Sequence, residues 1–415
     1  MKVLVIEPCY FGLGYLRALK EMSISCIVAT SDANFPDIHG YRDLVEHVVV
    51  CDVSNPNEIQ SAVKEINQLN FISAVVPGNQ FVTESAARFA VKHDLLGLTV
   101  SSANLGVHKD KARIAYQRSA APSLQFFLVN SVQQALLESE RIGYPLIVKP
   151  TSSASSKGVS LVYDDNELRA AFAVLSEMNF GVFGFQHRNE ILLEEFADGN
   201  EFSVELALEK KQLRFAGVTE KWVTAPPYFV ELGHVHPARI SSAQADALIS
   251  AAHQAAEALE LETGVFHVEL KLGENGPKII ECNPRPGGDH ITTDLVPLAT
   301  GVQLFEMHLD ILLKKPIKPN TKNIRGAAVG FVVATEAGEF QELIGMEELS
   351  ALPFLVRCVV EKKPGAAIRP PKSSEDRVAY IIVTGDNNEQ AVKNLKTAMS
   401  MVKIRSITLK APNEF

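Results

Sequence analysis

Cysteine is scarce in this chain, and its spacing argues against two common structural uses. The 415 residues include five cysteines, an odd number with no Cys-x-x-Cys pair, namely Cys9, Cys26, Cys51, Cys282 and Cys358. Disulfide scaffolds and structural zinc sites need paired or closely spaced thiols. The pattern therefore argues against a disulfide framework and against zinc, and it predicts reduced thiols in a cytoplasmic protein.

Long apolar runs and an excess of positive charge are also missing. No uninterrupted apolar stretch approaches the ~20 residues that a membrane-spanning helix needs. The first residues, MKVLVIEPCYFG, lack the charged start, long apolar stretch and cleavage site of a signal peptide. The net charge of −9 argues against general nucleic-acid binding, although it is compatible with a local basic pocket for phosphates. We expect neither a membrane nor a nucleic acid as a partner.

What the sequence does contain is enough residues for several domains, since 415 residues exceed one ordinary core. Residues 1–110 alternate short apolar strands with helices, which predicts a Rossmann-like parallel sheet covered on both faces. Phe11-Gly-Leu-Gly14 begins like a dinucleotide fingerprint, but Arg17 stands where a third glycine is expected. We therefore do not predict NAD binding from this segment.

Three further units follow along the chain. Residues 111–200 and 201–318 each mix strands with helices, which predicts two α+β lobes, and residues 319–415 form a separate small α+β lobe. The expected fold class is therefore a multidomain α/β and α+β protein.

The most informative segment is the hairpin sequence GVFHVELKLGENGPKIIECNPRPGGDH. Alternate residues of a strand share a face, so Glu281 and Asn283 lie together. A turn centred on Asn275 would place Glu269 directly across from Glu281, where two carboxylates repel. Magnesium binds carboxylates together with nucleotide phosphates, so we predict a magnesium site here, with Arg285 close to a phosphoryl group. The alternative is a solvent-facing hairpin whose acids pair with lysines.

A second candidate site is the polar loop at residues 151–158, which follows an apolar strand. Small hydroxyl residues and glycine let backbone N–H groups approach phosphate oxygens closely. The loop is not a GxxxxGK[ST] P-loop, and a serine-rich stretch alone is usually a flexible linker. Its place between two strands, with lysines on both sides, favours a phosphate-binding loop. The candidate residues are Lys149, Ser153, Ser156, Lys157 and Gly158.

A third candidate segment ends a short apolar strand with Glu194, Glu195 and Phe196, and Glu201 follows after a turn. Adenine can hydrogen-bond to the backbone of such a segment, and a nearby acid can accept hydrogen bonds from ribose hydroxyls. An ordinary exposed acid pair would be the simpler interpretation if nothing else accompanied it.

Taken together, these segments resemble the ATP-grasp superfamily in order and spacing, over roughly residues 105–315. The motifs are Asp110-Lys111, Ile147-Val-Lys149, Glu194-Glu-Phe196, Glu201-Phe-Ser203, Glu269 and Ile280-Glu-Cys-Asn-Pro-Arg285. The resemblance implies ATP held between two α+β lobes. It implies phosphate contacts by Lys111 and Lys149, adenine framed by Glu194 to Phe196, and ribose bound by Glu201. It also implies two magnesium ions, held by Glu269, Glu281 and Asn283.

Within that superfamily, residues 226–238 are similar to the substrate loop of L-amino acid ligases, a group that includes bacilysin-type dipeptide ligases and dapdiamide synthase. The C-terminal lobe also resembles that group. The resemblance implies that Glu231 and His234 line an amino-acid pocket near Arg285 and are candidate bases for the amine. A purely structural role for His234 or His236 remains an equal alternative. Asp289 fits either a substrate amine or a site crowded by carboxylates.

These features predict an ATP-dependent ligase that activates an amino-acid-like carboxylate as an acyl phosphate and joins it to an amine, as in dipeptide or peptide-antibiotic synthesis. ADP and phosphate would be released. The expected partners are small-molecule carboxylates and amines, and a homodimer is compatible with the sequence. Two rivals are a carboxylase or purine-pathway ligase of the same superfamily, and a nucleotide-binding regulatory protein without turnover. The complete set of cationic and metal-binding candidates argues against the regulatory protein.

Overall fold

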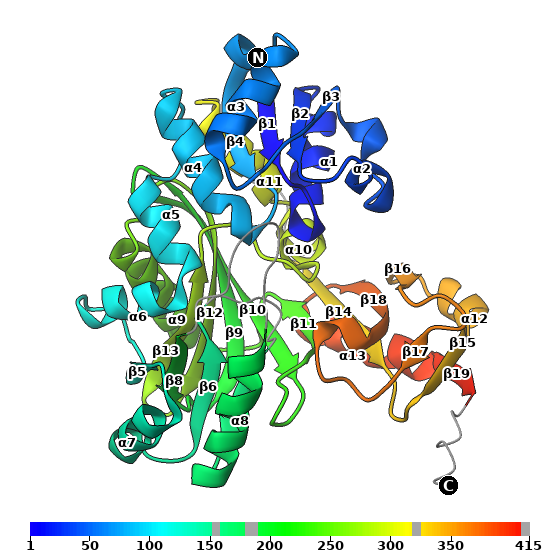
Figure 1. Ribbon diagram of the computed structural model, residues 1–415. Helices are drawn as coiled ribbons and strands as arrows, with labels where there is room; N and C mark the ends of the chain where they lie inside the picture. Colours follow the sequence, from blue (N-terminus) through cyan, green and yellow to red (C-terminus); the bar gives the residue numbers. More distant parts are fainter. Residues whose placement is uncertain (152–157, 179–189, 318–324, 408–415) are drawn as a thin grey trace, which may run out of the picture.

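The computed structural model describes residues 1–151, 158–178, 190–317 and 325–407. Figure 1 shows an N-terminal domain at one end, a long central body, and a C-terminal lobe that projects from its side. The first sheet is parallel and the others are antiparallel. The predicted multidomain α/β and α+β fold class is therefore confirmed.

The N-terminal domain is built on a four-stranded parallel sheet with the order β3-β2-β1-β4. Its strands are β1 (Lys2–Ile6), β2 (Ser25–Thr30), β3 (His47–Val50) and β4 (Ile72–Pro77), and its helices are α1 (Leu13–Glu21), α2 (Phe35–Ile38), α3 (Pro56–Glu65) and α4 (Thr83–Lys92). Apolar clusters fill both faces of the sheet, one around α1 and the other around α3 and α4. Burial on both faces explains why the strands are nearly continuous apolar runs.

The two glycines of the partial dinucleotide fingerprint permit close packing. A Cβ on Gly12 would lie 2.3 Å from the carbonyl oxygen of Gly78, and a Cβ on Gly14 would lie 2.4 Å from the ring of Phe305. Phe305 belongs to α11 (Leu304–Leu312). Because no larger residue fits without displacing these neighbours, the motif has an explanation that requires no dinucleotide.

A small antiparallel lobe follows helices α5 (Val100–Val107) and α6 (Lys109–Gln117). Its sheet has the order β5-β8-β6-β7 and consists of β5 (Phe126–Val129), β6 (Leu146–Pro150), β7 (Ser160–Val162) and β8 (Ile191–Glu195). Helices α7 (Val132–Ile142) and α8 (Asp165–Glu177) pack on this sheet through a shared apolar cluster.

The central body is an eight-stranded sheet with the order β13-β12-β9-β10-β11-β14-β18-β16. Its first five strands are β9 (Asn200–Glu209), β10 (Gln212–Val223), β11 (Glu231–His236), β12 (Gly264–Gly273) and β13 (Gly276–Asn283). Helix α9 (Ser242–Ala258) covers one face and begins at a capping box of Ser241 and Gln244. The π-helix Ile291–Leu295, α10 (Val296–Thr300) and α11 cover one end of the other face.

The C-terminal segment continues the same sheet. Strand β14 (Gly326–Val333) pairs with β11, and β18 (Arg377–Gly385) and β16 (Leu355–Val360) extend the sheet beside α13 (Asn388–Met401). A separate three-stranded sheet contains β15 (Gly338–Ile344), β17 (Ala367–Ile368) and β19 (Lys403–Ile407), and α12 (Met346–Ser350) follows β15. The boundary after residue 318 stays a prediction, since the units on its two sides share one sheet.

The cysteines form no disulfide, and the most apolar pair of helices belongs to the core. All five cysteines are free. Within the described ranges, no single helix has the length and apolar character that crossing a membrane requires. One helix pair, Ile291–Thr300 with Leu304–Leu312, meets that criterion only when joined across a bend of 103°. Many of its side chains are buried in the core beside β12 and β14.

Candidate functional site

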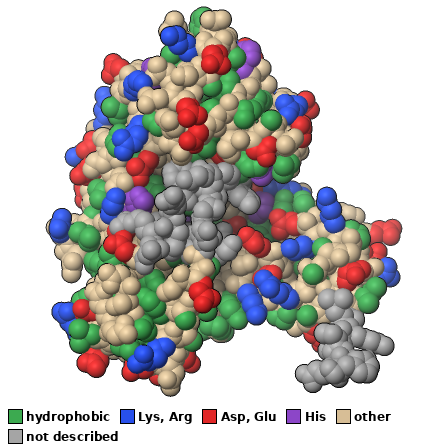
Figure 2. Space-filling view, in the orientation of Figure 1, with side chains coloured by type: hydrophobic (Ala, Val, Ile, Leu, Met, Phe, Trp, Pro, Cys, Tyr) green, Lys and Arg blue, Asp and Glu red, His purple; other side chains and the backbone are tan. Residues whose placement is uncertain are grey.

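One face of the eight-stranded sheet is apolar and the other carries the candidate site. On β9, Val204 and Leu206 pack under α9, and Ser203 and Glu205 occupy the alternate positions, which face away from that helix. Figure 2 shows a recess between the N-terminal domain and the C-terminal lobe, where acidic and histidine side chains are visible beside the grey atoms. Strand alternation therefore places the core on one face of the sheet and the polar candidate residues on the other.

Lys221 links three predicted parts of the site. Strand pairing places Lys221 of β10 between Glu201 of β9 and His234 of β11. Its Nζ lies 3.0 Å from the Glu201 carboxylate, 2.9 Å from Glu231 and 3.7 Å from Glu269. Burial lowers the pKa of Lys221, but the three acids outweigh burial and hold it well above its usual value. The sequence analysis missed this lysine, although its position across from Glu201 could have indicated it.

On its polar face the β12–β13 hairpin has the predicted pairing of Glu269 with Glu281. That pairing depends on a β-bulge as well as on the turn. Glu269 is paired with Glu281, and His267 with Asn283. The turn has two residues, 274–275, so a regular ladder would place Ile280 opposite Glu269. A bulge between Glu269 and Leu270 shifts the pairing and brings the two acids together.

The hairpin acids have cationic neighbours of their own. Lys109 Nζ donates a hydrogen bond of 2.7 Å to Glu281, and His267 Nε2 lies 3.2 Å from the Glu269 carboxylate. Burial raises the pKa of Glu269, but Lys221 and His267 reverse this effect and hold it below its usual value. The pairing of acids with lysines that the alternative interpretation requires is therefore present.

Asn283 is the feature that favours a metal at this place. Its side chain is 1% exposed, and Oδ1 has no hydrogen-bond partner in the part of the chain that the structure describes. A buried oxygen without a partner costs about 1–3 kcal/mol, so a ligand at this position would be stabilising. Glu269, Glu281 and Asn283 offer only oxygen atoms, the donors that magnesium prefers. The residues fit the predicted magnesium site, which stays a prediction.

A buried ion pair that the sequence analysis missed supports the hairpin end of the polar sheet face. His267 Nδ1 lies 2.6 Å from the Glu205 carboxylate, and Glu205 also accepts hydrogen bonds of 3.3 Å from the Gly287 amide and the Thr292 hydroxyl. Burial lowers the pKa of His267, but Glu205 and Glu269 raise it to about 9. Glu205 thereby fastens the loop after Arg285 to the floor of the site.

Glu194 and Lys149 belong to a second buried network. The Glu194 carboxylate accepts hydrogen bonds of 2.5 Å from Arg113 Nε and forms a 2.6 Å ion pair with Lys149 Nζ. Arg113 also donates to the backbone carbonyls of Ile279 and Ile280, so it ties the small lobe to the hairpin. Burial raises the pKa of Glu194, and the two cations lower it to about 2. The role of Glu194 beside adenine stays a prediction. Because its carboxylate is bonded to Arg113 and Lys149, only its backbone could contact adenine.

The structure places Lys109, not Lys111, at the hairpin. Lys111 Nζ donates to the Asn104 side chain at 2.5 Å, and Asn104 in turn donates to Glu84 of the N-terminal domain. The two lysines are two residues apart on α6, so their side chains project about 200° apart around the helix axis. Lys109 is therefore a better placed candidate for phosphate than the predicted Lys111.

The predicted adenine segment meets the loop before β11. The ring of Phe196 lies 6.3 Å from that of Phe229, and Lys271 Nζ lies 4.9 Å and 5.5 Å from the two ring centres. Phe229 has a left-handed backbone with φ of 49°. Glu195 pairs instead with Lys278 at 3.1 Å. Phe229 and Lys271 are thus additional candidates for an adenine pocket.

The predicted phosphate loop belongs only in part to the described residues. Ser153, Ser156 and Lys157 lie outside the described residues. Gly158 has a φ of 80°, a left-handed conformation that favours glycine.

Arg285 lies between the hairpin and the N-terminal domain. Its Nη2 donates to the Gln80 side chain at 3.4 Å, and its guanidinium lies 4.9 Å from the ring centre of Phe11. Its Nε is buried and lacks a hydrogen-bond partner among the described residues. The loops after β1 and β4 therefore form a wall beside this arginine.

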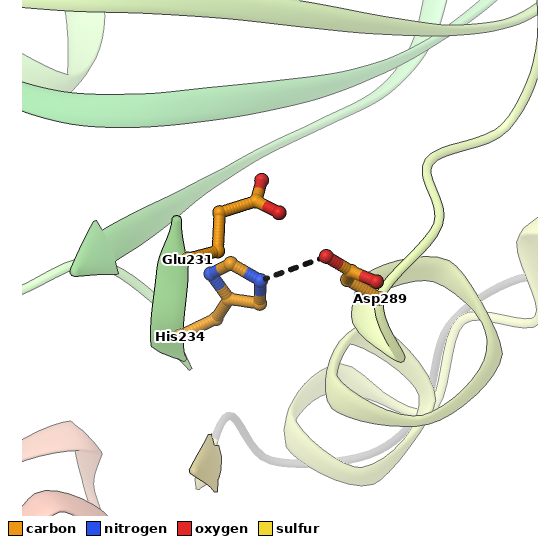
Figure 3. A group of neighbouring side chains, drawn as sticks. All are labelled: Glu231, His234 and Asp289. Atoms are coloured by element: carbon orange, nitrogen blue, oxygen red, sulfur yellow. Dashed lines mark ion pairs between the residues drawn. The ribbon is translucent and has the colours of Figure 1, made fainter. Parts of the chain in front are cut away.

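Glu231 and His234, both predicted pocket residues, meet Asp289 at the β11 end of the polar sheet face. Figure 3 shows these two residues of β11 facing Asp289, which lies in the loop before the π-helix. His234 Nε2 is 3.9 Å from the Asp289 carboxylate, too far for a hydrogen bond, and neither ring nitrogen has a partner in the described residues. Burial lowers the pKa of His234 to about 4, so the imidazole is neutral at pH 7. His236 lies elsewhere, 3.0 Å from the Thr219 hydroxyl.

Arg377 of the C-terminal lobe completes this group and was missed by the sequence analysis. Its Nη2 lies 3.0 Å from both the Glu231 and the Asp289 carboxylates. Burial, together with Asp289, raises the pKa of Glu231 above its usual value, although Lys221 opposes the increase. No local pattern marks Arg377, because its partners are 146 and 88 residues away along the chain.

Comparison with known families and structures agrees with this architecture. Residues 142–294 match the ATP-grasp domain, and residues 330–406 match the L-amino acid ligase C-terminal domain 2. The structure resembles the crystal structure of an L-amino acid ligase from Bacillus licheniformis with a TM-score of 0.83 and 21% identity, covering 98% of this chain and 99% of the other. The chain has an ATP-grasp fold. More narrowly, it combines an ATP-grasp domain with an L-amino acid ligase C-terminal domain.

Two curated relatives are named for different reactions. Carnosine synthase 1 of Homo sapiens is 31% identical over 224 residues, which cover 51% of this chain and 26% of the relative. This chain thus spans about a quarter of the length of that relative. The formate-dependent phosphoribosylglycinamide formyltransferase of Geobacter metallireducens is 26% identical over 316 residues, which cover 74% of each chain.

Proposed function

We propose that this protein is an ATP-dependent ligase that joins an amino-acid-like carboxylate to an amine through an acyl phosphate. The observation that carries the proposal is the hairpin of opposed acids Glu269 and Glu281 beside Asn283, whose buried amide oxygen lacks a partner. A site for magnesium–ATP at this place would lie next to Arg285 and on the same sheet face as the Glu231 and His234 pocket. The L-amino acid ligase C-terminal domain supports a carboxylate–amine ligase over other ATP-grasp reactions.

In the first step, the substrate carboxylate attacks the terminal phosphate of ATP and displaces ADP. Lys109, which lies at Glu281, and Arg285, which lies beside Gln80, would offset the negative charge on the phosphoryl oxygens. Such charge stabilisation is the main form of catalysis in phosphoryl transfer. Glu269, Glu281 and Asn283 would hold magnesium, which supplies further positive charge when bound. Lys149, fixed by Glu194 at 2.6 Å, would contribute at the small-lobe side.

In the second step, the amine displaces phosphate from the acyl phosphate. An amine that arrives as ammonium must lose a proton first, and a base works best with a pKa near the working pH. Glu231 is the candidate base, because burial and the neighbouring Asp289 raise its pKa above the usual value of a carboxyl group. The neutral His234 can accept a hydrogen bond from the amine.

A second candidate reaction is a carboxylase or purine-pathway ligase, which the similarity to the formyltransferase favours. The test is to incubate the protein with magnesium–ATP and a panel of amino acids and N-acylated amino acids, singly and in pairs. The proposal predicts ADP and phosphate, a rate that rises with the correct amine, and a hydroxamate when hydroxylamine is added. AMP would overturn the proposal. ADP release that needs bicarbonate and ignores amino acids would favour the carboxylase, and ATP binding without ADP release would favour a regulatory protein.

A further inference from the structure

Glu205 is a buried acid whose hydrogen-bonding capacity is used within the protein. Its side chain is 0% exposed. Oε1 accepts hydrogen bonds from His267 Nδ1 at 2.6 Å and from the Ser203 hydroxyl at 3.3 Å. Oε2 accepts hydrogen bonds from the Gly287 amide and the Thr292 hydroxyl, each at 3.3 Å. Because a carboxylate accepts about four hydrogen bonds, Glu205 has no capacity left for a ligand and can only hold other groups in place.

His267 connects this acid to Glu269, one of the proposed metal ligands. The two residues lie on the same face of β12, and His267 Nε2 is 3.2 Å from Oε1 of Glu269. The imidazole is 4% exposed. An ionised carboxylate only accepts hydrogen bonds, so both ring nitrogens act as donors. With Nδ1 fixed at Glu205, the other edge of the ring is directed at Glu269.

The neighbours of Glu269 leave one of its oxygens open. Lys221 Nζ also faces Oε1, at 3.7 Å, so the lysine and the imidazole meet the same oxygen. Among the described residues, no hydrogen bond reaches Oε2. The side chain of Glu269 is 25% exposed, and strand pairing places Glu281 opposite it and Asn283 opposite His267. The open oxygen is thus available to an ion that these residues share.

We propose that His267 is a positioning residue of the magnesium site. Fixed by Glu205, it holds one carboxylate oxygen of Glu269 so that the other can bind the metal ion. The inference rests on the proposed function and adds to it the pair of residues that orients a metal ligand. Loss of a hydrogen-bond partner behind a metal ligand typically weakens metal binding about 10–100-fold.

The loop after Arg285 leaves room for this arrangement at one position. A Cβ on Gly287 would lie 2.7 Å from His267 Nδ1 and 2.9 Å from Oε2 of Glu205. A Cβ on the next residue, Gly288, would meet nothing within 4 Å. A side chain at residue 287 would therefore displace the imidazole or the carboxylate, and one at residue 288 would not.

The direct test measures metal binding and needs no turnover. Mn²⁺ replaces magnesium, ADP is kept at saturation, and the EPR signal of the free ion gives the dissociation constant. An asparagine amide nitrogen takes the place of Nδ1, and a glutamine amide nitrogen takes the place of Nε2. His267→Asn should therefore weaken Mn²⁺ binding about 10–100-fold, whereas His267→Gln can still donate to Glu269 and should weaken it less than about 5-fold.

His236→Asn is the matched control. His236 is also a buried histidine of this sheet, 1% exposed, but its ring lies 3.0 Å from the uncharged Thr219 hydroxyl. This variant should leave the dissociation constant of Mn²⁺ unchanged. A folded His267→Asn protein with wild-type affinity would overturn the inference. Equal losses in His267→Asn and His267→Gln, or an equal loss in His236→Asn, would also overturn it.

Gly287→Ala decides if neither His267 variant folds, since it removes no charge from the core. It should weaken Mn²⁺ binding about 10-fold, and Gly288→Ala should leave it unchanged. Wild-type affinity in Gly287→Ala would contradict the inference. If the wild type binds no Mn²⁺ with ADP, the metal assignment and this inference fail together. Mn²⁺ binding without hydroxamate formation would remove the ligase proposal and leave the role of His267 in place.

Discussion

The two ends of the polar sheet face are built in different ways. At the β12–β13 end, Glu269, Glu281 and Asn283 come from the two strands of one hairpin. At the β11 end, Glu231 meets Asp289 and Arg377, and these contacts join three segments that are far apart in the sequence. The first arrangement suits a task that does not vary, such as the proposed binding of magnesium and phosphates. The second can change with the C-terminal lobe, which is where substrate choice would be set.

The largest expected effect is at the hairpin end. Glu281→Gln, and separately Asn283→Ala, should lower the rate of ADP release on the order of 10³-fold, because each removes an oxygen donor from the proposed metal site. The melting temperature should fall little, since Glu281→Gln also removes a like-charge repulsion. Glu274→Gln, in the exposed turn of the same hairpin, is the control and should be fully active. Near-normal activity of Glu281→Gln at low magnesium would show the metal assignment to be wrong.

The network that holds the small lobe on the hairpin should matter for stability. Glu194→Gln should lower the free energy of unfolding at pH 7 on the order of 3 kcal/mol, since it leaves Arg113 and Lys149 without their buried acid. The folded-state pKa of Glu194 is lowered to about 2, so this contribution is present above pH 4.5 and shrinks as the pH falls from 4.5 towards 2. Urea unfolding at several pH values measures both effects.

The exposed pair Lys211–Glu262 provides the control for that experiment. Glu262→Gln should leave unfolding unchanged within error at every pH, because solvent screens such a pair. A pH-independent difference between Glu194→Gln and the wild type below pH 4.5 would contradict the ionised, buried state of Glu194.

Lys109 and Lys111 of α6 are rival candidates for the lysine that contacts the phosphates of ATP. Lys109→Met should reduce kcat/KM for ATP about 10²-fold, because its ammonium lies at Glu281. Lys111→Met should change it less than about 3-fold, because its ammonium is held at Asn104. Steady-state kinetics at varied ATP distinguishes them. A larger loss for Lys111→Met would restore the assignment made from the sequence.

The smallest catalytic effect is expected at the pocket end. His234→Ala should lower kcat/KM for the amine about 10-fold, by removing one hydrogen-bond acceptor, and should change the KM for ATP less than about 3-fold. Glu231→Ala should likewise lower kcat/KM for the amine. Equal losses in ATP binding and in amine use would mean that the two ends of the sheet face do not have separate roles.

Much of the hairpin end could be predicted because it depends on local rules. Strand alternation alone puts Glu281 and Asn283 on one face, and the cross-strand pairing of Glu269 follows from the short turn once the bulge is included. The positions of these residues could be predicted from the geometry of paired strands alone.

The rest depends on contacts that the sequence does not encode locally. Arg377 reaches Glu231 because β14 pairs with β11 and β18 with β14, and nothing near Arg377 indicates that order. The choice between Lys109 and Lys111 depends on which face of α6 meets the hairpin. Glu194 shows a different difficulty, because an acid at a strand end looks exposed until Arg113 and Lys149 are found beside it.

The central claim is that a carboxylate takes the terminal phosphate of ATP before an amine is joined to it. The most direct measurement uses the donor carboxylate labelled with ¹⁸O, magnesium–ATP and the amine, with the released phosphate examined by ³¹P NMR or mass spectrometry. The acyl-phosphate mechanism requires that one labelled oxygen passes from the carboxylate to phosphate and none to ADP. Label in AMP, or product formed with unlabelled phosphate, would contradict the account.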